Sequence, residues 1–186
     1  MPIDRDAKSS LESAFRAAKR ISIITSGVAL YGKRKNGGAQ MKDTHGNHTV
    51  VRPETVGDVM TRQVITMNPH DSFSDAITLM AKHSFRHFLV VDAANNLVGV
   101  VSDRDILRML ARTANLQGTS VSQFMSRDVI TVTPETRLSH AVEKMLSKRI
   151  NCLPVLDDTK NLCGIITSTD FLKAYRSMQE SAEKQE

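Results

Sequence analysis

The sequence is poor in aromatic residues and in cysteine. Its 186 residues include no Trp, two Tyr and six Phe, and its two cysteines are Cys152 and Cys163. Nine Met residues stand beside many Val, Ile and Leu, which indicates a core of aliphatic and thioether side chains. Two cysteines do not make the disulfide framework of a small secreted domain, and these two flank an expected hairpin at positions that do not face each other. This usage fits a reducing compartment, and we expect the cytoplasm.

The sequence also lacks a long apolar run. The longest apolar stretch, Ile21–Leu30, is too short to cross a bilayer, which takes about 20 apolar residues. It resembles the apolar part of a signal peptide, but the acidic residues before it, Asp4, Asp6 and Glu12, argue against a secretion signal.

The motifs of the common enzyme classes are missing as well. The chain has no GxSxG, no GxxxxGK[ST], no CxxC and no HExxH, and its six His residues are scattered. We therefore expect no catalytic residues, no metal site and no enzymatic activity.

The net charge of +5 is concentrated at the N-terminus. Residues 1–55 hold ten Lys or Arg and five Asp or Glu, whereas residues 56–186 hold fifteen of each. An attraction to nucleic acid or to an anionic membrane would therefore involve the first segment alone. The larger part of the chain does not favour either partner.

Residues 1–55 are expected to form a flexible N-terminal extension. Ser10–Ile21 is predicted to be a short amphipathic helix. The stretch from Tyr31 to Val51 is rich in Gly, Lys, Asn and His without periodicity, and it is predicted to be linker or disordered. Residues 1 to about 50 are expected to pack little. The basic cluster Lys33-Arg34-Lys35 lies within it.

An internal repeat dominates the rest of the chain. A shift of 65 residues places residues 56–112 on residues 121–177 without a gap, with 17 of 57 positions identical. A gapless match with coincident Pro, Gly and Asp residues indicates a duplication rather than similar secondary structure. We expect the first copy over residues 56–115, the second over 116–178 and a polar tail over 179–186.

Each copy has the pattern strand, helix, strand, strand, helix. Short β-branched and apolar runs predict the strands, and apolar positions at helical spacing predict the helices. The fold class expected is α+β, with the two copies packed about a pseudo-two-fold axis so that each covers the apolar sheet face of the other. In the first copy the elements are expected near residues 64–67, 72–83, 88–92, 97–102 and 102–110.

Each copy closes with a glycine, two apolar residues, a hydroxyl residue and an Asp three positions later. These stretches are Gly99–Asp105 (GVVSDRD) and Gly164–Asp170 (GIITSTD). A hydroxyl residue at a helix start, followed three residues later by an acid, is a common N-terminal cap. The same helix start offers free N–H groups to a phosphate, and its carboxylate can accept from the hydroxyls of a ribose. The spacing alone leaves both interpretations open.

These features resemble the CBS (cystathionine beta-synthase) domain. The resemblance is carried by the strand that begins Val64-Ile65-Thr66, by Arg86–Asp92 (RHFLVVD), and by the GxxSxxD and GxxTxxD stretches of the two copies. It covers about residues 56–177 and implies a non-catalytic module that binds an adenine nucleotide (AMP, ADP or ATP) or S-adenosylmethionine in a cleft between the two repeats. The nucleotide would be a regulatory ligand and not a cofactor.

The resemblance also implies roles for individual residues. Asp105 and Asp170 would hold ribose, hydroxyl and basic side chains would meet phosphate, and the first strand of each copy would contact the base. The implied ligand-binding residues are Ile65, Thr66, Arg86, His87, Ser102, Arg104 and Asp105 in the first copy, and Ile130, Thr131, Thr167, Ser168, Thr169 and Asp170 in the second.

The two copies are not equivalent as binding sites. Thr167, Ser168 and Thr169 offer three hydroxyls beside Asp170, whereas Asp103 adds a second acid beside Asp105. An extra acid repels phosphate, so the tighter site is expected on Asp170. Leu89 also stands where the family pattern, like Pro154 in the second copy, has a proline.

The resemblance further implies a homodimer that passes its ligand state to an effector protein not identified by the sequence. An alternative is an interaction or dimerisation protein without a nucleotide. Its basic N-terminal tail would then dock on a partner, a nucleic acid or an anionic membrane.

Overall fold

The structure is a computed structural model that describes residues 23–24, 40–42, 48–50, 52–83, 85–113 and 115–183. The chain forms two compact units, each with its own core. Unit 1 contains β1 (Ile23–Ile24) and residues 64–129. Unit 2 contains β2 (Gln40–Lys42), β3 (His48–Val50), residues 52–63 and residues 130–183.

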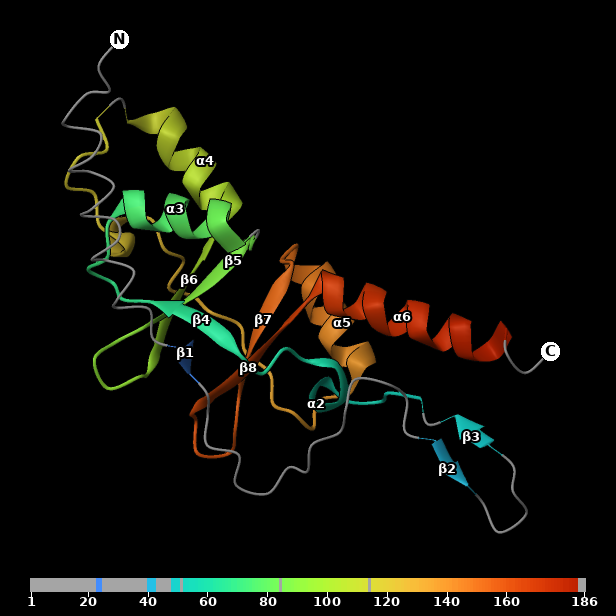
Figure 1. Cartoon of the computed structure of the whole chain (residues 1–186). Helices are drawn as coiled ribbons and strands as arrows, with labels where there is room; N and C mark the ends of the chain where they lie inside the picture. The colour runs from blue at the N-terminus through green and yellow to red at the C-terminus, as the bar shows by residue number, and fades with distance from the viewer. Residues whose placement is uncertain are drawn as a thin grey trace. The chain divides into compact units, whose positions relative to one another are not determined.

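Unit 1 is a four-stranded sheet with helices (Figure 1). The strand order is β1-β4-β5-β6, in which β4 and β5 are parallel and the other neighbours are antiparallel. Its elements are β4 (Val64–Met67), α3 (Phe73–His83), β5 (His87–Val91), β6 (Leu97–Ser102), α4 (Asp103–Arg112) and the 3-10 helix η2 (Val121–Gln123).

Unit 2 repeats this pattern with a shorter sheet. Strands β7 and β8 form an antiparallel pair, and β2 and β3 form a separate antiparallel pair. Its other elements are α2 (Val56–Val59), α5 (Leu138–Lys148), β7 (Cys152–Leu156), β8 (Leu162–Thr167) and α6 (Ser168–Glu183). Helix α6 runs past residue 178, so residues 179–183 of the polar tail continue the helix.

The order strand, helix, strand, strand, helix is confirmed in unit 1 but is incomplete in unit 2. The strand expected around Ile130-Thr131 is reduced to one parallel bridge between Val132 and Val155. The physical reason lies in the neighbouring strand, where Pro154 occupies the position of Leu89 in β5. Proline has no N–H to donate, which removes one hydrogen bond from the ladder and shortens the pairing.

The opening segment of each repeat packs into the unit that contains the other repeat. Val56, from the first repeat, is fully buried in the core of unit 2, and Val121, from the second, is fully buried in the core of unit 1. Thr61 pairs with Ile165 of β8 through two hydrogen bonds of 2.9 Å. The compact units therefore do not coincide with the repeats at 56–115 and 116–178.

The close approach of these segments depends on a glycine in each unit. A Cβ on Gly164 would lie 2.9 Å from the backbone oxygen of Thr61, and a Cβ on Gly99 would lie 2.7 Å from the sulfur of Met125. Both distances are shorter than a methyl group tolerates, so a side chain at Gly164 would displace backbone, whereas one at Gly99 would first displace the flexible side chain of Met125.

The N-terminal extension is only partly described. The helix expected over Ser10–Ile21 and the cluster Lys33-Arg34-Lys35 lie outside the described residues. The expectation that this segment packs little is wrong for Ile23–Ile24, which pair with β4 at Val64 and Ile65. The free edge of β4 and the β-branched Ile pair account for this extra strand. In the ranges that the structure describes, no helix has the length and apolar character needed to cross a membrane.

We predict that Gly164→Ala lowers the free energy of unfolding by about 1–3 kcal/mol, because the new methyl group meets a backbone atom that cannot move without breaking the pairing with Thr61. Gly99→Ala should cost less, since its nearest atom belongs to the flexible side chain of Met125. Urea unfolding of both variants tests this order. Equal stability of Gly164→Ala and the parent protein would contradict the close approach.

Candidate ligand-binding site

The start of α6 in unit 2 surrounds a buried carboxylate. Strand β8 ends at Thr167 and α6 begins at Ser168, so Asp170 lies in the first helical turn. The backbone N–H and the hydroxyl of Thr167 donate to Oδ2 of Asp170 at 2.8 and 2.7 Å. Asp170 is only 7% exposed, Ser168 is half-buried and Thr169 is exposed.

A hydroxyl from the opening segment of the first repeat completes this cluster. The Thr61 Oγ1 donates to Oδ1 of Asp170 at 3.2 Å across 109 residues of sequence. Sequence reasoning missed Thr61. The available signal was the shift of 65 residues, which places Thr61 on Ser126, so that a hydroxyl residue stands three positions before the first strand residue in both copies.

The start of α4 in unit 1 has a similar arrangement with a different third donor. The N–H and hydroxyl of Ser102 donate to Oδ2 of Asp105 at 2.8 and 2.6 Å, and the Asp105 N–H donates back to the hydroxyl at 3.4 Å. Oδ1 of Asp105 accepts from Nη1 of Arg108 at 2.9 Å, an ion pair within the helix. The expected cap is therefore confirmed at Ser102, whose hydroxyl accepts from the Asp105 N–H, whereas at Thr167 the structure shows the two bonds donated to the Asp170 carboxylate.

Comparison with known proteins accounts for the repeat and the paired caps. The model of the CBS domain family matches residues 56–112 and again residues 121–177. The chain belongs to the CBS domain family. Both matches contain one complete capped motif, Gly99–Asp105 or Gly164–Asp170.

Individual relatives support the same assignment. The chain is 31% identical over 137 residues to inosine-5'-monophosphate dehydrogenase of Methanocaldococcus jannaschii, a match that covers 74% of this chain and 27% of that protein. It is 27% identical over 177 residues to L-aspartate semialdehyde sulfurtransferase of the same organism, covering 93% of this chain and 34% of that protein. The chain thus spans about a third or less of the length of these curated relatives.

Solved CBS structures are similar over almost their whole length. The CBS domain pair of protein MJ0100, in complex with 5'-methylthioadenosine and S-adenosyl-L-methionine, has a TM-score of 0.61 and 29% identity, covering 67% of this chain and 97% of that one. CBSX2 in complex with AMP has a TM-score of 0.60 and 29% identity, covering 68% of this chain and 99% of that one.

Basic and acidic side chains gather around the first CBS motif. The register of β5 and β6 places His87 opposite Ser102, and the Asp103 N–H donates to the carbonyl of Arg86 at 3.0 Å. Burial lowers the pKa of His87; Arg86 and Arg104 lower it further, while Asp103 and Asp105 oppose the shift. Five of the residues implied by the family resemblance, Arg86, His87, Ser102, Arg104 and Asp105, therefore lie in one region of unit 1.

The residues expected to contact the base are divided between the units. In unit 1, Ile65 packs against the core and Thr66 is buried. In unit 2, Ile130 packs against the core and Thr131 is half-buried. Their role in reading adenine stays a prediction.

The carboxylates of both motifs are held in fixed orientations. Each Asp carboxylate accepts hydrogen bonds from three donor groups. Within the described ranges, no three His, Cys, Asp or Glu side chains gather in the way that a metal site requires. Cys163 donates its thiol to the carbonyl of Val155, and burial raises the pKa of that thiol, which lowers its reactivity.

The lowered pKa of His87 predicts a loss of stability in mild acid. Above the unfolded-state value of about 6.5, His87 is neutral in both states. Below it, the unfolded chain binds the proton more readily than the folded chain, so the free energy of unfolding falls as the pH drops towards the folded pKa. We expect a shallower fall between about pH 7 and pH 5 in His87→Gln, measured by urea unfolding. At pH 8 His87 is neutral in both states, so a difference in the free energy of unfolding there reports lost packing alone. If the free energies of unfolding of the parent and His87→Gln fall in parallel between about pH 7 and pH 5, the prediction is contradicted.

Proposed function

We propose that this CBS pair is a non-catalytic regulatory module whose main ligand site is built on Asp170. The observation that carries the proposal is the buried Asp170 carboxylate, which Thr167 and Thr61 hold at the start of α6. The ligand is an adenine nucleotide or S-adenosylmethionine. Related CBS pairs have been solved with AMP and with S-adenosyl-L-methionine and 5'-methylthioadenosine, which all contain adenosine.

The geometry around Asp170 fits an adenosine ligand. Oδ2 already accepts two short bonds, whereas Oδ1 accepts one bond of 3.2 Å from Thr61, so Oδ1 retains acceptor capacity for a ribose hydroxyl. A phosphate at the same helix start would meet first-turn N–H groups and the hydroxyls of Ser168 and Thr169. The shared part of the candidate ligands is thus recognised by the carboxylate, and the variable part by the helix start.

The Asp105 copy is the weaker nucleotide site in this proposal. Oδ1 of Asp105 is engaged by Arg108 at 2.9 Å, shorter than the bond from Thr61 to Asp170. A ribose would have to displace that charge-assisted partner before it could bind. The neighbouring acid Asp103 adds repulsion against a phosphate.

The module would act as a sensor in the cytoplasm, with a partner protein reading its ligand state. A ligand can shift such a module only by the difference in its affinity for two states of the protein. The sequence has none of the common catalytic motifs, and we propose binding without turnover.

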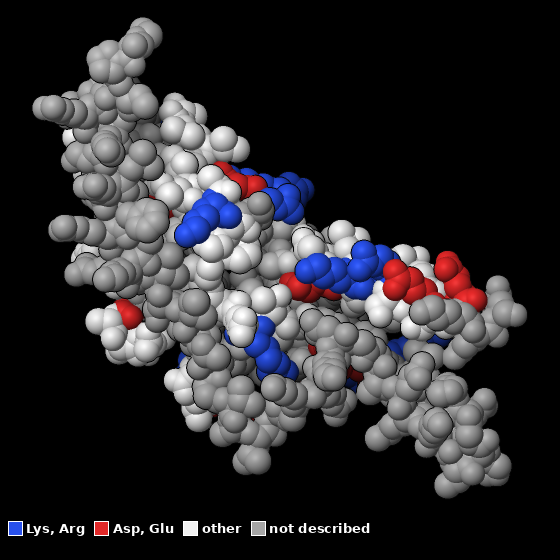
Figure 2. Space-filling view, in the orientation of Figure 1, with Lys and Arg blue, Asp and Glu red and all other residues white. Residues whose placement is uncertain are grey.

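The alternative of a docking protein without nucleotide depends on the basic extension. Figure 2 shows a group of basic side chains beside a group of acidic side chains along α6, where Arg176 pairs with Glu180 at 3.4 Å. A surface of mixed charge does not attract nucleic acid or an anionic membrane over a large area. Docking by the extension remains a hypothesis for residues 1–55.

We predict that Asp170→Asn weakens AMP binding by about ten- to a hundredfold, because a charge-assisted bond to ribose is lost. Asp105→Asn should weaken it much less. The Asn side chain can still accept from Thr167 and donate to the hydroxyl oxygen of Thr61, so the fold should persist at a cost of about 1 kcal/mol. Isothermal titration calorimetry of the three proteins with AMP and with S-adenosylmethionine measures both effects. Unchanged affinity in Asp170→Asn would leave the motif as a cap alone.

We also propose that the module forms a homodimer through its last helices. Leu107 and Leu110 on α4 are 64% and 49% exposed, and the equivalent Leu172 and Tyr175 on α6 are 68% and 58% exposed. The duplication thus presents the same apolar stripe twice. We propose that a second copy of the chain covers these stripes, since a two-fold axis pairs identical surfaces and buries their large apolar side chains.

The double variant Leu107→Glu/Leu172→Glu is expected to be monomeric under conditions in which the parent protein is a dimer. Charges in a buried apolar contact are costly, whereas on an exposed helix face they are tolerated. Light scattering after size-exclusion chromatography measures the mass. The control Lys160→Glu, in the turn between β7 and β8, should stay dimeric. A dimeric double variant would place the contact elsewhere.

A further inference from the structure

A strand from the N-terminal extension occupies one edge of the sheet in unit 1. Strand β1 pairs with β4 in antiparallel register, with Ile23 opposite Ile65 and Ile24 opposite Val64 (Figure 1). The match to the CBS family model begins at residue 56, so β1 lies outside the matched repeats. It is therefore an addition to the domain and not a part of its repeated pattern.

The added strand engages backbone groups of β4. In an antiparallel ladder, opposed residues alternate between a pair that exchanges both N–H···O bonds and a pair that exchanges none. The two opposed pairs therefore engage the N–H and the C=O of one β4 residue, either Val64 or Ile65. The next residues of β4, Thr66 and Met67, pair with β5 on the other side. Strand β4 is thus paired on both sides.

The second repeat shows that the domain closes its core without a strand at this position. The shift of 65 residues places Val64–Thr66 on Val129–Thr131. Within the described part of the chain, no strand pairs with that segment. The neighbouring Val132 donates to the carbonyl of Pro154 at 3.1 Å and accepts from the N–H of Leu156 at 2.9 Å, and the core of unit 2 is still complete. The packing of the repeat therefore does not explain β1.

The edge of a strand offers groups that an adenine base can recognise. Each outward-facing residue at a free edge presents one N–H donor and one C=O acceptor. Adenine presents a donor, its N6 amino group, next to an acceptor, its N7. The two sets are complementary, so an adenine base and β1 can compete for the same backbone groups of Val64 or Ile65.

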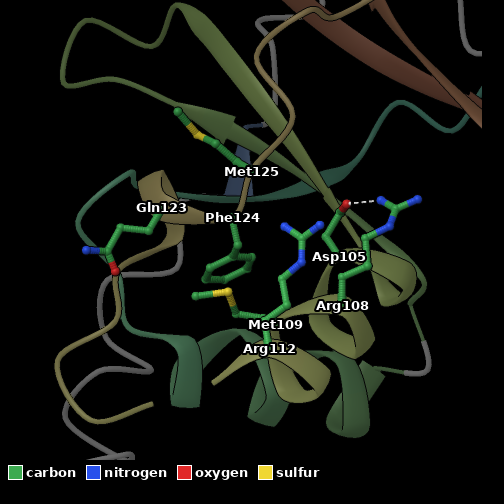
Figure 3. Close-up of a pocket in the computed structure, with 7 residues that line it drawn as sticks. All are labelled: Asp105, Arg108, Met109, Arg112, Gln123, Phe124 and Met125. Carbon is green, nitrogen blue, oxygen red and sulfur yellow. Dashed lines mark hydrogen bonds and ion pairs between the residues drawn. The ribbon is translucent and has the colours of Figure 1, made fainter. Parts of the chain in front are cut away.

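The edge of β4 is near the proposed ribose contact along the chain. Thr61 donates to Asp170 at 3.2 Å, and Val64 follows Thr61 by three residues. An extended chain spans at most about 3.6 Å per residue, so Val64 lies within about 11 Å of Thr61. The other candidate carboxylate, Asp105, is engaged by Arg108 at 2.9 Å, as Figure 3 shows. A nucleotide held at Asp170 is therefore the one expected to use this edge.

We propose that β1 is an autoinhibitory strand, which occupies the edge of β4 that the adenine base of a nucleotide on Asp170 would use. This inference rests on the proposed function and adds the regulation of that site. A strand of two residues is short even for an edge strand, so it can be displaced while the repeat stays folded. By linkage, a nucleotide favours release of the extension, and a partner that captures the released extension raises the affinity for the nucleotide by the same factor.

Release of β1 in the full chain tests the inference. The double variant Ile23→Pro/Ile24→Pro removes both N–H groups of the strand, so the ladder cannot form. If β1 is docked in about nine molecules of ten, its release raises the apparent affinity for AMP about tenfold. Isothermal titration calorimetry with AMP is expected to show a gain of about three- to tenfold. Ribose 5-phosphate, which lacks the base, should bind both proteins equally in a competition titration against AMP.

Two control variants match this change. Ile23→Val/Ile24→Val keeps β-branched residues in the strand and should bind AMP as the parent does. Met41→Pro/Lys42→Pro removes two N–H groups from β2, which pairs with β3 and not with β4, so it should also bind as the parent does.

Three results would overturn the inference. They are equal AMP affinity in the parent and Ile23→Pro/Ile24→Pro, an equal gain in Met41→Pro/Lys42→Pro, and an equal gain for ribose 5-phosphate. Asp170→Asn distinguishes these results from a failure of the proposed function. If it abolishes AMP binding while the strand variant changes nothing, the nucleotide site stands without the inhibitory strand. If it leaves AMP binding intact, the proposed function fails.

Discussion

The structure depends on two short contacts between an opening segment and the last strand of the opposite repeat. In unit 2, Thr61 exchanges two backbone hydrogen bonds with Ile165, next to Gly164. In unit 1, Ser126 makes the same exchange with Val100, next to Gly99, with bonds of 2.9 and 3.0 Å. Each contact seats a fully buried valine in the core that it closes, so neither repeat has a complete core without residues from the other.

The same contact connects folding with the proposed site. The segment that pairs with β8 is held at Thr61, and the hydroxyl of that residue reaches Asp170. In the other copy the equivalent Ser126 is paired in the same way, but Asp105 is engaged by Arg108 from its own helix. The two copies thus have the same backbone pairing, but their Asp carboxylates accept from different side chains. A duplication fixes the fold twice and leaves the side chains around each Asp free to diverge.

Local features of this fold could be predicted from the sequence. The cap at Ser102 follows from residues three apart in the sequence, and the structure contains it. The exchange of opening segments could not be predicted. An apolar residue such as Val56 is expected to be buried, but the sequence does not indicate which of the two cores it enters. Thr61 was missed for the same reason, since its partner is 109 residues away.

The shortened first strand of the second repeat shows how one residue overrides a repeated pattern. The residues of Val64–Thr66 recur unchanged at Val129–Thr131, so propensity predicts two equal strands. The difference lies in the neighbouring strand, where Pro154 has no N–H to offer. A pattern within one segment cannot report the hydrogen-bonding capacity of the segment beside it.

Helix α4 brings several roles together on separate faces. Ile106 is buried in the core, Leu107 and Leu110 form the exposed stripe, and Asp105 accepts from Ser102 at the helix start. A helix is stiff along its length, so in the proposed module a ligand that changed how the start of α4 is held would also move the stripe. If the stripe is the proposed dimer contact, a difference in ligand affinity between two positions of the helix is, by linkage, a difference in the strength of that contact. The proposed module would then need no hinge between ligand and partner, because one helix carries both surfaces.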